Sequence, residues 1–373
     1  MRSLRILLTN LCLHSLTGTE LYIYDLARRL LARGHRPVVY TPLPGQLATR
    51  LIEQSIPVVR QLEMMTESPD VIHGHHSLET MTALWRFPGV PAIFVCHDCS
   101  AWHDHAPRSP RIHRYVAVDV ACRDRLTLRD GISAERVVVL NNGVDLERFR
   151  PRGPLPERPR RALLFSNYAD ARTRQVVEAA CSACGVHLDV LGKNQGNACD
   201  HPETVLPQYD IVFAKGRCAW ESLAVGAAVV VCDANACGPL VTSDRFAELA
   251  AANFGRRLLC QPLDEETLVR QLRRFDAADA ADVSRQARQR AALDHVVDQL
   301  VELYGQVIEE HRQAPPAPAA EWAAAAEFLH WWSLERQSQI ESQLALLRRR
   351  PSRLQRWWRS LKKRLLPTQR QAA

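Results

Sequence analysis

The sequence has no long hydrophobic run, although 46% of its 373 residues are hydrophobic. No stretch approaches the roughly 18 uncharged apolar residues of a transmembrane helix, so we expect no membrane span. The N-terminus also lacks the long apolar core and small-residue cleavage site of a secretion signal, which predicts a cytoplasmic protein. Charged residues make up 24% of the chain, a globular composition that argues against disorder and fibrous structure. At about 150 residues per domain, the length predicts two globular domains and a further segment.

Acidic residues are absent beyond Glu341, where ten basic residues follow. Without these ten, the net charge of +7 becomes −3, so the rest of the chain is close to neutral. A nucleic-acid enzyme carries its basic charge on the folded body, and we therefore expect no nucleic-acid partner.

Residues 321–347 have a helix-forming composition, and Pro351 is expected to begin another helix. Basic side chains, leucines and tryptophans at helical spacing in 348–366 predict peripheral binding to an anionic membrane surface, and packing on the body or a second subunit is the alternative.

The cysteine pattern argues against disulfides and against a structural metal. Eleven cysteines is an odd number, and without an export signal we expect reduced, mostly buried thiols. The two Cys-x-x-Cys pairs begin at Cys96 and Cys181, too far apart in the chain for one zinc site. His97, His103 and His105 follow Cys96 without the spacing of a metal motif, so we expect no bound metal.

Short apolar runs alternate with helix-like segments along most of the chain. In the first 150 residues the runs are 5–9, 37–40, 71–73, 92–95, 115–118 and 137–140. After residue 150 they are 162–165, 186–191, 211–213, 228–232 and 257–260. Strands without inside–outside alternation, separated by helices, indicate parallel sheets covered on both faces. The sequence thus predicts an α/β protein with two doubly wound, Rossmann-like domains.

Two proline-rich segments divide the chain. Residues 151–159 hold four prolines in nine positions and predict a stiff linker between domains 1–150 and 151–312. A second proline-rich spacer, 313–320, opens a helical tail that spans 313–373. Two doubly wound domains place a ligand in the cleft that faces the carboxyl ends of both sheets.

Four segments carry a family resemblance: 16–35 (LTGTELYIYDLARRLLARGH), 95–98 (VCHD), 137–151 (VVVLNNGVDLERFRP) and 210–229 (DIVFAKGRCAWESLAVGAAV). Their order and spacing resemble the retaining glycosyltransferases of the family-4 type, which have the GT-B fold. The resemblance implies two Rossmann-like domains that face a central cleft, the first on the acceptor side and the second on the nucleotide-sugar side. It implies transfer of a sugar, with retention, from a nucleoside-diphosphate sugar to a glycan or lipid-linked acceptor, with no further cofactor and no protein nucleophile.

The leaving pyrophosphate of such a donor gains negative charge, which a metal or fixed cations must stabilise. The chain contains no Asp-x-Asp pair, which argues against the metal-dependent, single-domain glycosyltransferase architecture. Lys215 and Arg217 lie in the turn that enters a helix, where cations disfavour folding but suit a diphosphate. We therefore expect both to act on the leaving group, and a pair of solvated side chains is the alternative.

The resemblance implies further contacts to the donor. Glu221 matches the carboxylate that accepts hydrogen bonds from the ribose hydroxyls, a role suited to an acceptor-only group. Gly18, with Thr19 after it, matches the glycine loop that lets the backbone approach a phosphate. For Glu221 the alternative is a first-turn acid that complements the helix dipole. For Gly18 the alternative is an ordinary N-cap turn.

The histidines at two strand ends are further candidates. His97 matches a family histidine that contacts the donor sugar or stabilises the transition state, with Asp98 expected to orient it. The run that contains His73, His75 and His76 ends the preceding strand and is a candidate for the acceptor side, although a hydrogen-bonded loop is the simpler interpretation.

The sequence also departs from the family pattern. Phe213 stands where relatives often carry another glutamate. The basic pair after the first strand of the second domain is not cleanly present, since Asn167 occupies that strand exit, and Lys193 is a candidate substitute. These differences keep two alternatives open: a sugar-nucleotide epimerase on the same fold, and a non-catalytic subunit for sugar-nucleotide binding or assembly.

Overall fold

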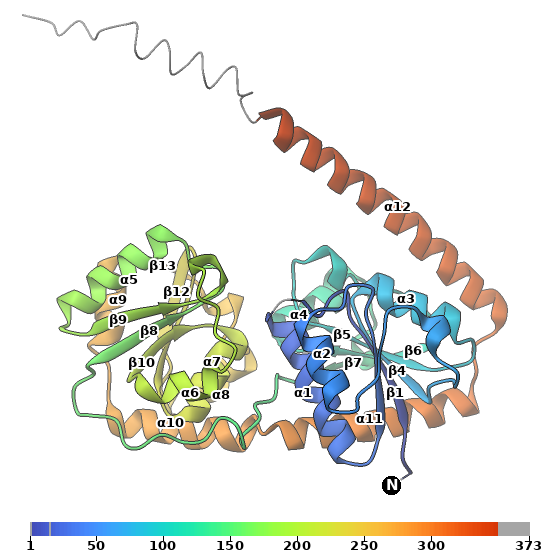
Figure 1. Cartoon of the computed structure of the whole chain (residues 1–373). Helices are drawn as coiled ribbons and strands as arrows, with labels where there is room; N and C mark the ends of the chain where they lie inside the picture. Colours follow the sequence, from blue (N-terminus) through green and yellow to red (C-terminus); the bar gives the residue numbers. More distant parts are fainter. Residues whose placement is uncertain (1, 15, 350–373) are drawn as a thin grey trace, which may run out of the picture. The chain divides into compact units, whose positions relative to one another are not determined.

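The structure, a computed structural model, describes residues 2–14 and 16–349. The chain up to Pro318 forms one compact unit, and a second unit begins at Ala319, in the first turn of the helix α12 (Pro318–Arg349). The first unit has two lobes, each built around its own sheet (Figure 1). Among the described residues, no helix combines the length and apolar character that a bilayer crossing requires.

The first sheet has seven strands, all parallel, in the order β3-β2-β1-β4-β5-β6-β7. Its strands are β1 (Arg5–Thr9), β2 (Arg36–Tyr40), β3 (Val58–Val59), β4 (Val71–His75), β5 (Ala92–Cys96), β6 (Ile112–Ala117) and β7 (Val137–Val139). The chain moves outward from β1 to β3 and then returns to place β4 on the other side of β1. The strand order therefore reverses between β1 and β4, which is the topological switch point of a doubly wound sheet.

The second sheet has six strands in the order β13-β12-β11-β10-β8-β9. Its strands are β8 (Arg161–Phe165), β9 (His187–Leu191), β10 (Ile211–Ala214), β11 (Ala228–Asp233), β12 (Ala236–Leu240) and β13 (Gln261–Pro262). β8 to β11 are parallel, and the switch point lies between β8 and β10. β12 and β13 add an antiparallel edge that the sequence analysis did not anticipate.

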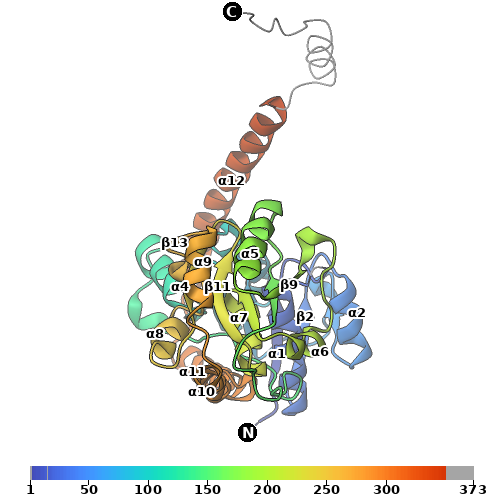
Figure 2. The same ribbon diagram turned by 90° about the vertical axis from the view of Figure 1, so that its left-hand side faces the viewer.

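Helices cover both faces of each sheet, as Figures 1 and 2 show. The α-helices of the first unit are α1 (Gly18–Ala32), α2 (Gln46–Glu53), α3 (Ser77–Arg86), α4 (Val120–Asp124), α5 (Ala171–Ala183), α6 (Pro202–Val205), α7 (Gly216–Val225), α8 (Phe246–Ala251), α9 (Glu265–Leu272), α10 (Ala277–Arg290) and α11 (Leu293–Gln313). In the second lobe, α5 and α9 pack together on one face, and α7 and α10 pack together on the other. The domain boundaries at residues 150 and 312 stay predictions. The predicted second domain includes nearly all of α11, but α11 packs on the first lobe, against α1, β5 and β6.

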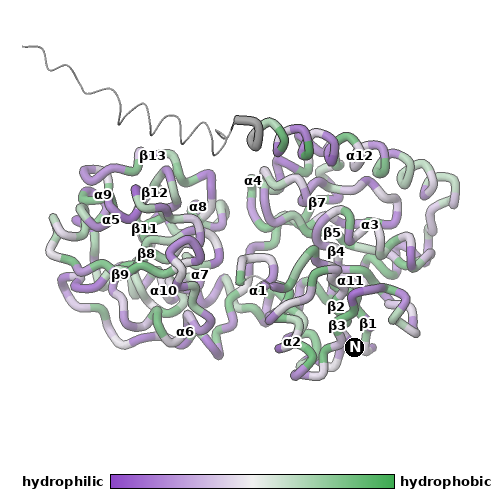
Figure 3. Tube along the Cα trace, turned by 45° about the horizontal axis from the view of Figure 1, so that its top comes forward, coloured by the Kyte–Doolittle hydropathy of each residue, from purple (hydrophilic) through white to green (hydrophobic). Residues whose placement is uncertain are grey.

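The strands lie in the hydrophobic interior because both faces of each sheet are covered. Every residue of β4, β5 and β10 is buried, and Figure 3 shows mainly hydrophobic segments along the central strands. The two residues Val212 and Phe213 of β10 belong to the hydrophobic clusters on opposite faces of the second sheet. This two-sided burial explains why the strands read as continuous apolar runs. The eleven cysteines, all within the described residues, are free thiols as expected, but only five are buried, so the expectation of mostly buried thiols is wrong.

The predicted strand at 257–260 is wrong. Arg256–Leu258 forms a 3₁₀ turn instead, and the edge strand β13 begins at Gln261. A four-residue apolar run does not distinguish a strand from a packed turn, and here Leu258 and Leu259 pack against the core without joining the ladder. The helix predicted over 321–347 is confirmed as α12. The helix expected from Pro351, and most of the membrane-binding segment 348–366, lie outside the described residues.

Candidate functional site

The predicted residues of the first lobe lie where its parallel strands end. β1 is followed by a loop and by α1, which begins at Gly18 and Thr19. β4 is followed by His76, and β5 by His97. Because ligands of open α/β sheets bind outside the carboxyl ends of the strands at the switch point, this edge is the natural ligand side of the lobe. Gly18 is exposed with open space beside it, so its close approach to a phosphate stays a prediction.

The second lobe places three predicted residues at the corresponding edge. Asn167 follows β8, Lys193 follows β9, and Lys215 follows β10 as the N-cap of α7. The side-chain oxygen Oδ1 of Asn167 accepts a hydrogen bond from the Lys193 backbone N–H at 3.0 Å. The Lys215 ammonium forms an ion pair with Asp233 at the end of β11 and lies 5.2 Å from the ring centroid of Tyr168. The structure thus places Asn167 and Lys215 at the switch point between β8 and β10, with the backbone of Lys193 bound to Asn167.

A buried ionic cluster connects the two lobes. It consists of Asp25 of α1, Arg148, Glu203 of α6, and Arg217 and Glu221 of α7. The Arg217 guanidinium pairs with the Asp25 carboxylate and, through Nε, with Oε1 of Glu221 at 2.7 Å. Arg148 donates to Oδ1 of Asp25 at 3.1 Å and to Oε2 of Glu203 at 3.0 Å. Asp25 and Glu221 are only 2% and 3% exposed, so these charges interact away from bulk solvent.

The helix α7 explains how two predicted residues meet. Arg217 and Glu221 are four positions apart, which places them on the same helical face. Burial raises the pKa of Glu221, and the adjacent Arg217 charge opposes that rise. Lys215 is paired with Asp233, and Arg217 with Asp25 and Glu221, so their expected action on the leaving group stays a prediction. Phe213 is fully buried in the hydrophobic layer shared with α5 and α9, so its position does not face this cluster.

Three histidines form a stack that leads from the core to the ligand edge, and we call His73, His75 and His97 the histidine column. Nε2 of His97 lies 2.9 Å from Nδ1 of His75, with their rings stacked at 4.8 Å between centroids. His75 stacks on His73 at 4.7 Å, and Nδ1 of His73 lies 2.6 Å from the Tyr304 hydroxyl of α11. Tyr22 of α1 packs edge-on against His75 and His97. The column therefore holds His97 by packing and by one ring nitrogen.

The surroundings keep the column uncharged near neutral pH. Burial lowers the pKa of His73 and of His97 to about 3, and the pKa of His75 is also well below its ordinary value. For His97 the positive charge of Arg217 also lowers the pKa. The expectation that Asp98 orients His97 is wrong. The Asp98 carboxylate instead accepts hydrogen bonds from the backbone N–H groups of Ser100 and Ala101. The hydrogen-bond partner of His97 is His75.

Replacing His73 with glutamine is expected to weaken the pH dependence of stability. A histidine with a folded pKa near 3 and an unfolded pKa near 6.5 stabilises the fold fully above pH 6.5, and this contribution is lost as pH falls. Below about pH 6 the loss is about 1.4 kcal/mol per pH unit per histidine. Denaturant unfolding at pH 6 and 5 should show that the variant loses about 1.4 kcal/mol less than the wild type. Parallel pH profiles would contradict this, and the exposed His187→Gln variant serves as the control.

The start of α1 is held by a buried acid. Glu20 is 5% exposed, accepts a hydrogen bond from the Cys12 thiol at 3.1 Å, and also accepts one from the Thr17 hydroxyl. These contacts fix the loop between β1 and Gly18. Glu20 was not singled out as a site residue in the sequence, although it is the first-turn acid of the helix.

A second polar cluster lies beside the column. Within the described ranges, ligand atoms of His76, His103 and Asp104 lie within 4.8 Å of one another, near enough to hold a cation. The Leu11 backbone N–H, however, donates to Nδ1 of His76 at 2.9 Å, which places the His76 proton on Nε2. In this tautomer His76 is a donor and not a metal ligand. Burial raises the pKa of Asp104 to about 7, and its Oδ1 finds no hydrogen-bond partner among the described residues.

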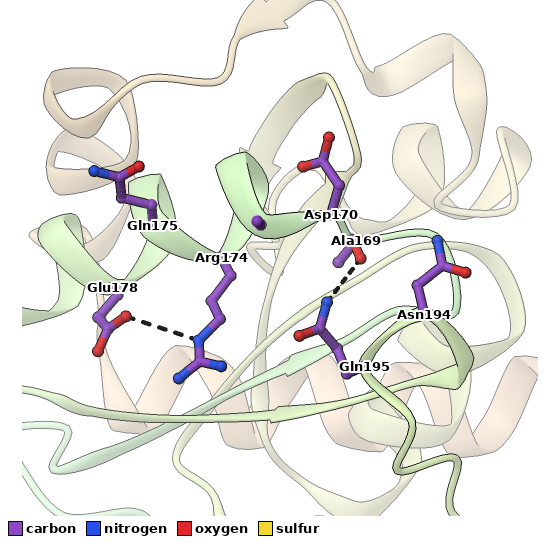
Figure 4. Close-up of a pocket in the computed structure, with 8 residues that line it drawn as sticks. Ala169, Asp170, Arg174, Gln175, Glu178, Asn194 and Gln195 are labelled. Carbon is purple, nitrogen blue, oxygen red and sulfur yellow. Dashed lines mark hydrogen bonds and ion pairs between the residues drawn. The ribbon is translucent and has the colours of Figure 1, made fainter. Parts of the chain in front are cut away.

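A cavity of about 580 Å³ opens in the second lobe, between the start of α5 and the 3₁₀ turn Lys193–Gln195 (Figure 4). Its lining residues are Ala169, Asp170, Ala171, Arg174, Gln175, Glu178, Asn194 and Gln195. The Gln195 side-chain amide donates to the Ala169 carbonyl at 2.9 Å across this hollow. Lys193 directly precedes the lining residue Asn194, and Asn167 lies two positions before Ala169, whereas Arg217 and Glu221 do not line the cavity.

Sequence reasoning did not identify Asp25 or Arg148. A signal was present for Asp25, because it is a charged residue on the helical face that also carries the buried Tyr22 and Leu26. A buried carboxylate requires a partner. Arg148 offered no such signal, since its two partners come from distant parts of the chain.

Comparison with known proteins supports the architecture. Residues 16–148 match the family model of Glycosyltransferase Family 4. A curated protein of Arabidopsis thaliana, one of the subunits of phosphatidylinositol N-acetylglucosaminyltransferase, is 25% identical over 37% of this chain and 39% of that protein. The chain thus matches well under half of that relative's length.

Two solved structures share the fold. A glycosyltransferase from Rickettsia africae ESF-5 superposes with a TM-score of 0.62 at 14% identity and covers 83% of this chain and 99% of its own. Anabaena HepE in complex with UDP and glucose gives a TM-score of 0.61 at 16% identity, with 81% and 99% coverage. The two-lobed body has the GT-B fold, and the predicted resemblance to family-4 glycosyltransferases is confirmed.

Proposed function

We propose that this chain transfers a sugar, with retention, from a nucleoside-diphosphate sugar to a glycan or lipid-linked acceptor. The observation that carries the proposal is the ion pair of Arg217 with Asp25 of α1, which brings Arg217 and its partner Glu221 from the second lobe against the first. Lys215 and Asn167 at the switch point of the second sheet add support. The likeness to a structure that binds UDP and glucose supports a nucleotide-sugar donor.

In this reaction the bond between the sugar C1 and the phosphate oxygen breaks, and the nucleoside diphosphate leaves with the electron pair. The acceptor oxygen then bonds to C1 on the same face, and its proton passes to the departing phosphate. Lys215, Arg217 and the N-terminus of α7 would stabilise the leaving charge. Glu221 would accept hydrogen bonds from the ribose hydroxyls. Neutral His97 contacts His75 through Nε2, so its Nδ1 is the nitrogen left to bind the donor sugar.

The proposed enzyme works without a metal or another cofactor. The absence of an Asp-x-Asp pair from the sequence and the donor tautomer of His76 support this part of the proposal. A cytoplasmic location, with peripheral attachment to the inner membrane face through 348–366, stays a prediction from the basic composition of that segment.

Calorimetry with UDP, GDP and ADP, carried out in the presence of EDTA, tests the proposal. One of the three is expected to bind, and Glu221→Gln is expected to weaken that binding by roughly ten- to a hundredfold, because hydrogen bonds to a charged acceptor are worth about 1.5–3 kcal/mol. The matched control Glu248→Gln, on the exposed surface of the same lobe, should leave the Kd unchanged.

Four results would refute the proposal or its parts. No binding of any nucleotide would favour a non-catalytic protein, and loss of binding in EDTA would refute metal independence. An unchanged Kd in Glu221→Gln would refute the role of that carboxylate. Isomerised donor sugar formed without any acceptor would identify an epimerase.

A further inference from the structure

Both guanidinium groups of the ionic cluster are bound to one carboxylate. We infer that Asp25 occupies the place of a donor phosphate between Arg148 and Arg217, and that donor binding exchanges Asp25 for the diphosphate. The inference rests on the proposed function, because it concerns the same anion-binding side chains. It adds Arg148 to the diphosphate site and makes Asp25 an internal competitor of the donor.

The geometry of Asp25 resembles that of a bound anion. Each carboxylate oxygen receives one arginine: Oδ1 accepts from Arg148 at 3.1 Å, and Oδ2 accepts from Arg217. Arginine pairs in the same way with carboxylate and phosphate oxygens, since both offer two acceptors to its planar donors. Asp25 is 2% exposed, so solvent does not compete for these contacts.

The charges of the cluster explain why exchange is required. Three carboxylates, of Asp25, Glu203 and Glu221, face the two guanidinium groups, so the cluster carries one net negative charge as it stands. A diphosphate added to this set would enter a negative environment at low dielectric, which is unfavourable. Removal of the Asp25 carboxylate leaves two carboxylates and two guanidinium groups, and the incoming phosphates then take the contacts that Asp25 gave up.

Replacing Asp25 by a donor phosphate would also change the contacts between the two lobes. Asp25 belongs to α1 of the first lobe, and Arg217 to α7 of the second. When phosphate replaces Asp25 on Arg217, this ion pair between α1 and α7 is lost. Donor binding is thereby linked to release of one interlobe contact. A different interlobe pair, Asp200 with Arg50 at 2.8 Å, shares no residue with the cluster and provides a comparison.

The test compares Asp25→Asn with the wild type by calorimetry, using inorganic pyrophosphate and, separately, UDP, GDP and ADP. Asparagine keeps the shape of the side chain and removes its charge. Pyrophosphate and the preferred nucleotide are expected to bind about tenfold or more tightly to the variant, because a buried pair no longer has to be broken. The control Asp200→Asn removes another interlobe carboxylate and should leave both affinities unchanged.

Each outcome decides the question. Pyrophosphate affinity that is equal or lower in Asp25→Asn overturns the inference, and so does an equal gain in Asp200→Asn, which would point to general loosening of the lobes. A pyrophosphate gain without nucleotide binding in either protein keeps the inference and refutes the proposed function. If Asp25→Asn does not fold, Arg148→Gln is used: weaker pyrophosphate binding supports the site, and unchanged binding overturns it.

Discussion

Replacing Arg217 with methionine is expected to lower kcat/KM for the proposed sugar transfer by at least about a hundredfold. The guanidinium would stabilise charge on the leaving diphosphate, and loss of one such group from a preorganised site typically costs about 10²–10³ in rate. The same change leaves Asp25 and Glu221 without their shared cation in a buried place. Because breaking a buried ion pair costs about 3–5 kcal/mol, the free energy of unfolding should also fall.

A double variant separates the two effects of Arg217→Met. Adding Asp25→Asn removes one of the stranded carboxylates, so the double variant should recover part of the lost stability in denaturant unfolding. Its transfer rate should stay low, because the cation for the leaving group is still missing. Recovery of activity together with stability would show that Arg217 acts only in folding.

Replacing Trp220 with alanine is expected to destabilise the second lobe by about 3–5 kcal/mol, the typical cost of deleting a buried aromatic side chain. Trp220 is fully buried and packs edge-on against Phe246 and Phe254, with ring centroids 6.0 and 4.7 Å away. Its indole N–H also donates to Oδ1 of Asn253 at 2.6 Å. These contacts anchor α7 and, with it, the adjacent Glu221.

Denaturant unfolding measures the effect of Trp220→Ala, and Trp220→Phe should cost less because most of the apolar contact is kept. Trp322→Ala, in the exposed part of α12, is the control and should leave the free energy of unfolding nearly unchanged. A loss below about 1 kcal/mol for Trp220→Ala would show that the site collapses around the missing ring.

Much of the architecture could be predicted because strand and helix signals are local. The apolar runs of β1, β8 and β10 are uninterrupted, and each is followed by an α-helix, which indicates parallel sheets. Local signals failed at 257–260, where a short apolar run forms a packed turn, and at β12, whose antiparallel pairing depends on its partner β11. Gly226 ends α7 with a φ of 101°, a left-handed conformation that favours glycine.

The candidate site was predicted only in part. Asn167, Lys215 and His97 lie at strand ends, and strand ends are readable from sequence because the next residue leaves the apolar run. The side chains that contact these residues could not be predicted from the sequence. The tautomeric and electrostatic state of His97 depends on His75 and Arg217, and a strand exit alone says nothing about which side chains face it.

The sequence by itself determined the two doubly wound lobes and the places where their strands end, because the hydrophobic period and the turn residues act over a few positions. Only the tertiary structure decided that Asp25 holds Arg217 and that the histidine column is buried against α11. Asp25 and Arg217 are 192 positions apart, and Tyr304 is 231 positions from His73. Pairing over such separations depends on how whole helices and sheets pack, which no local pattern encodes.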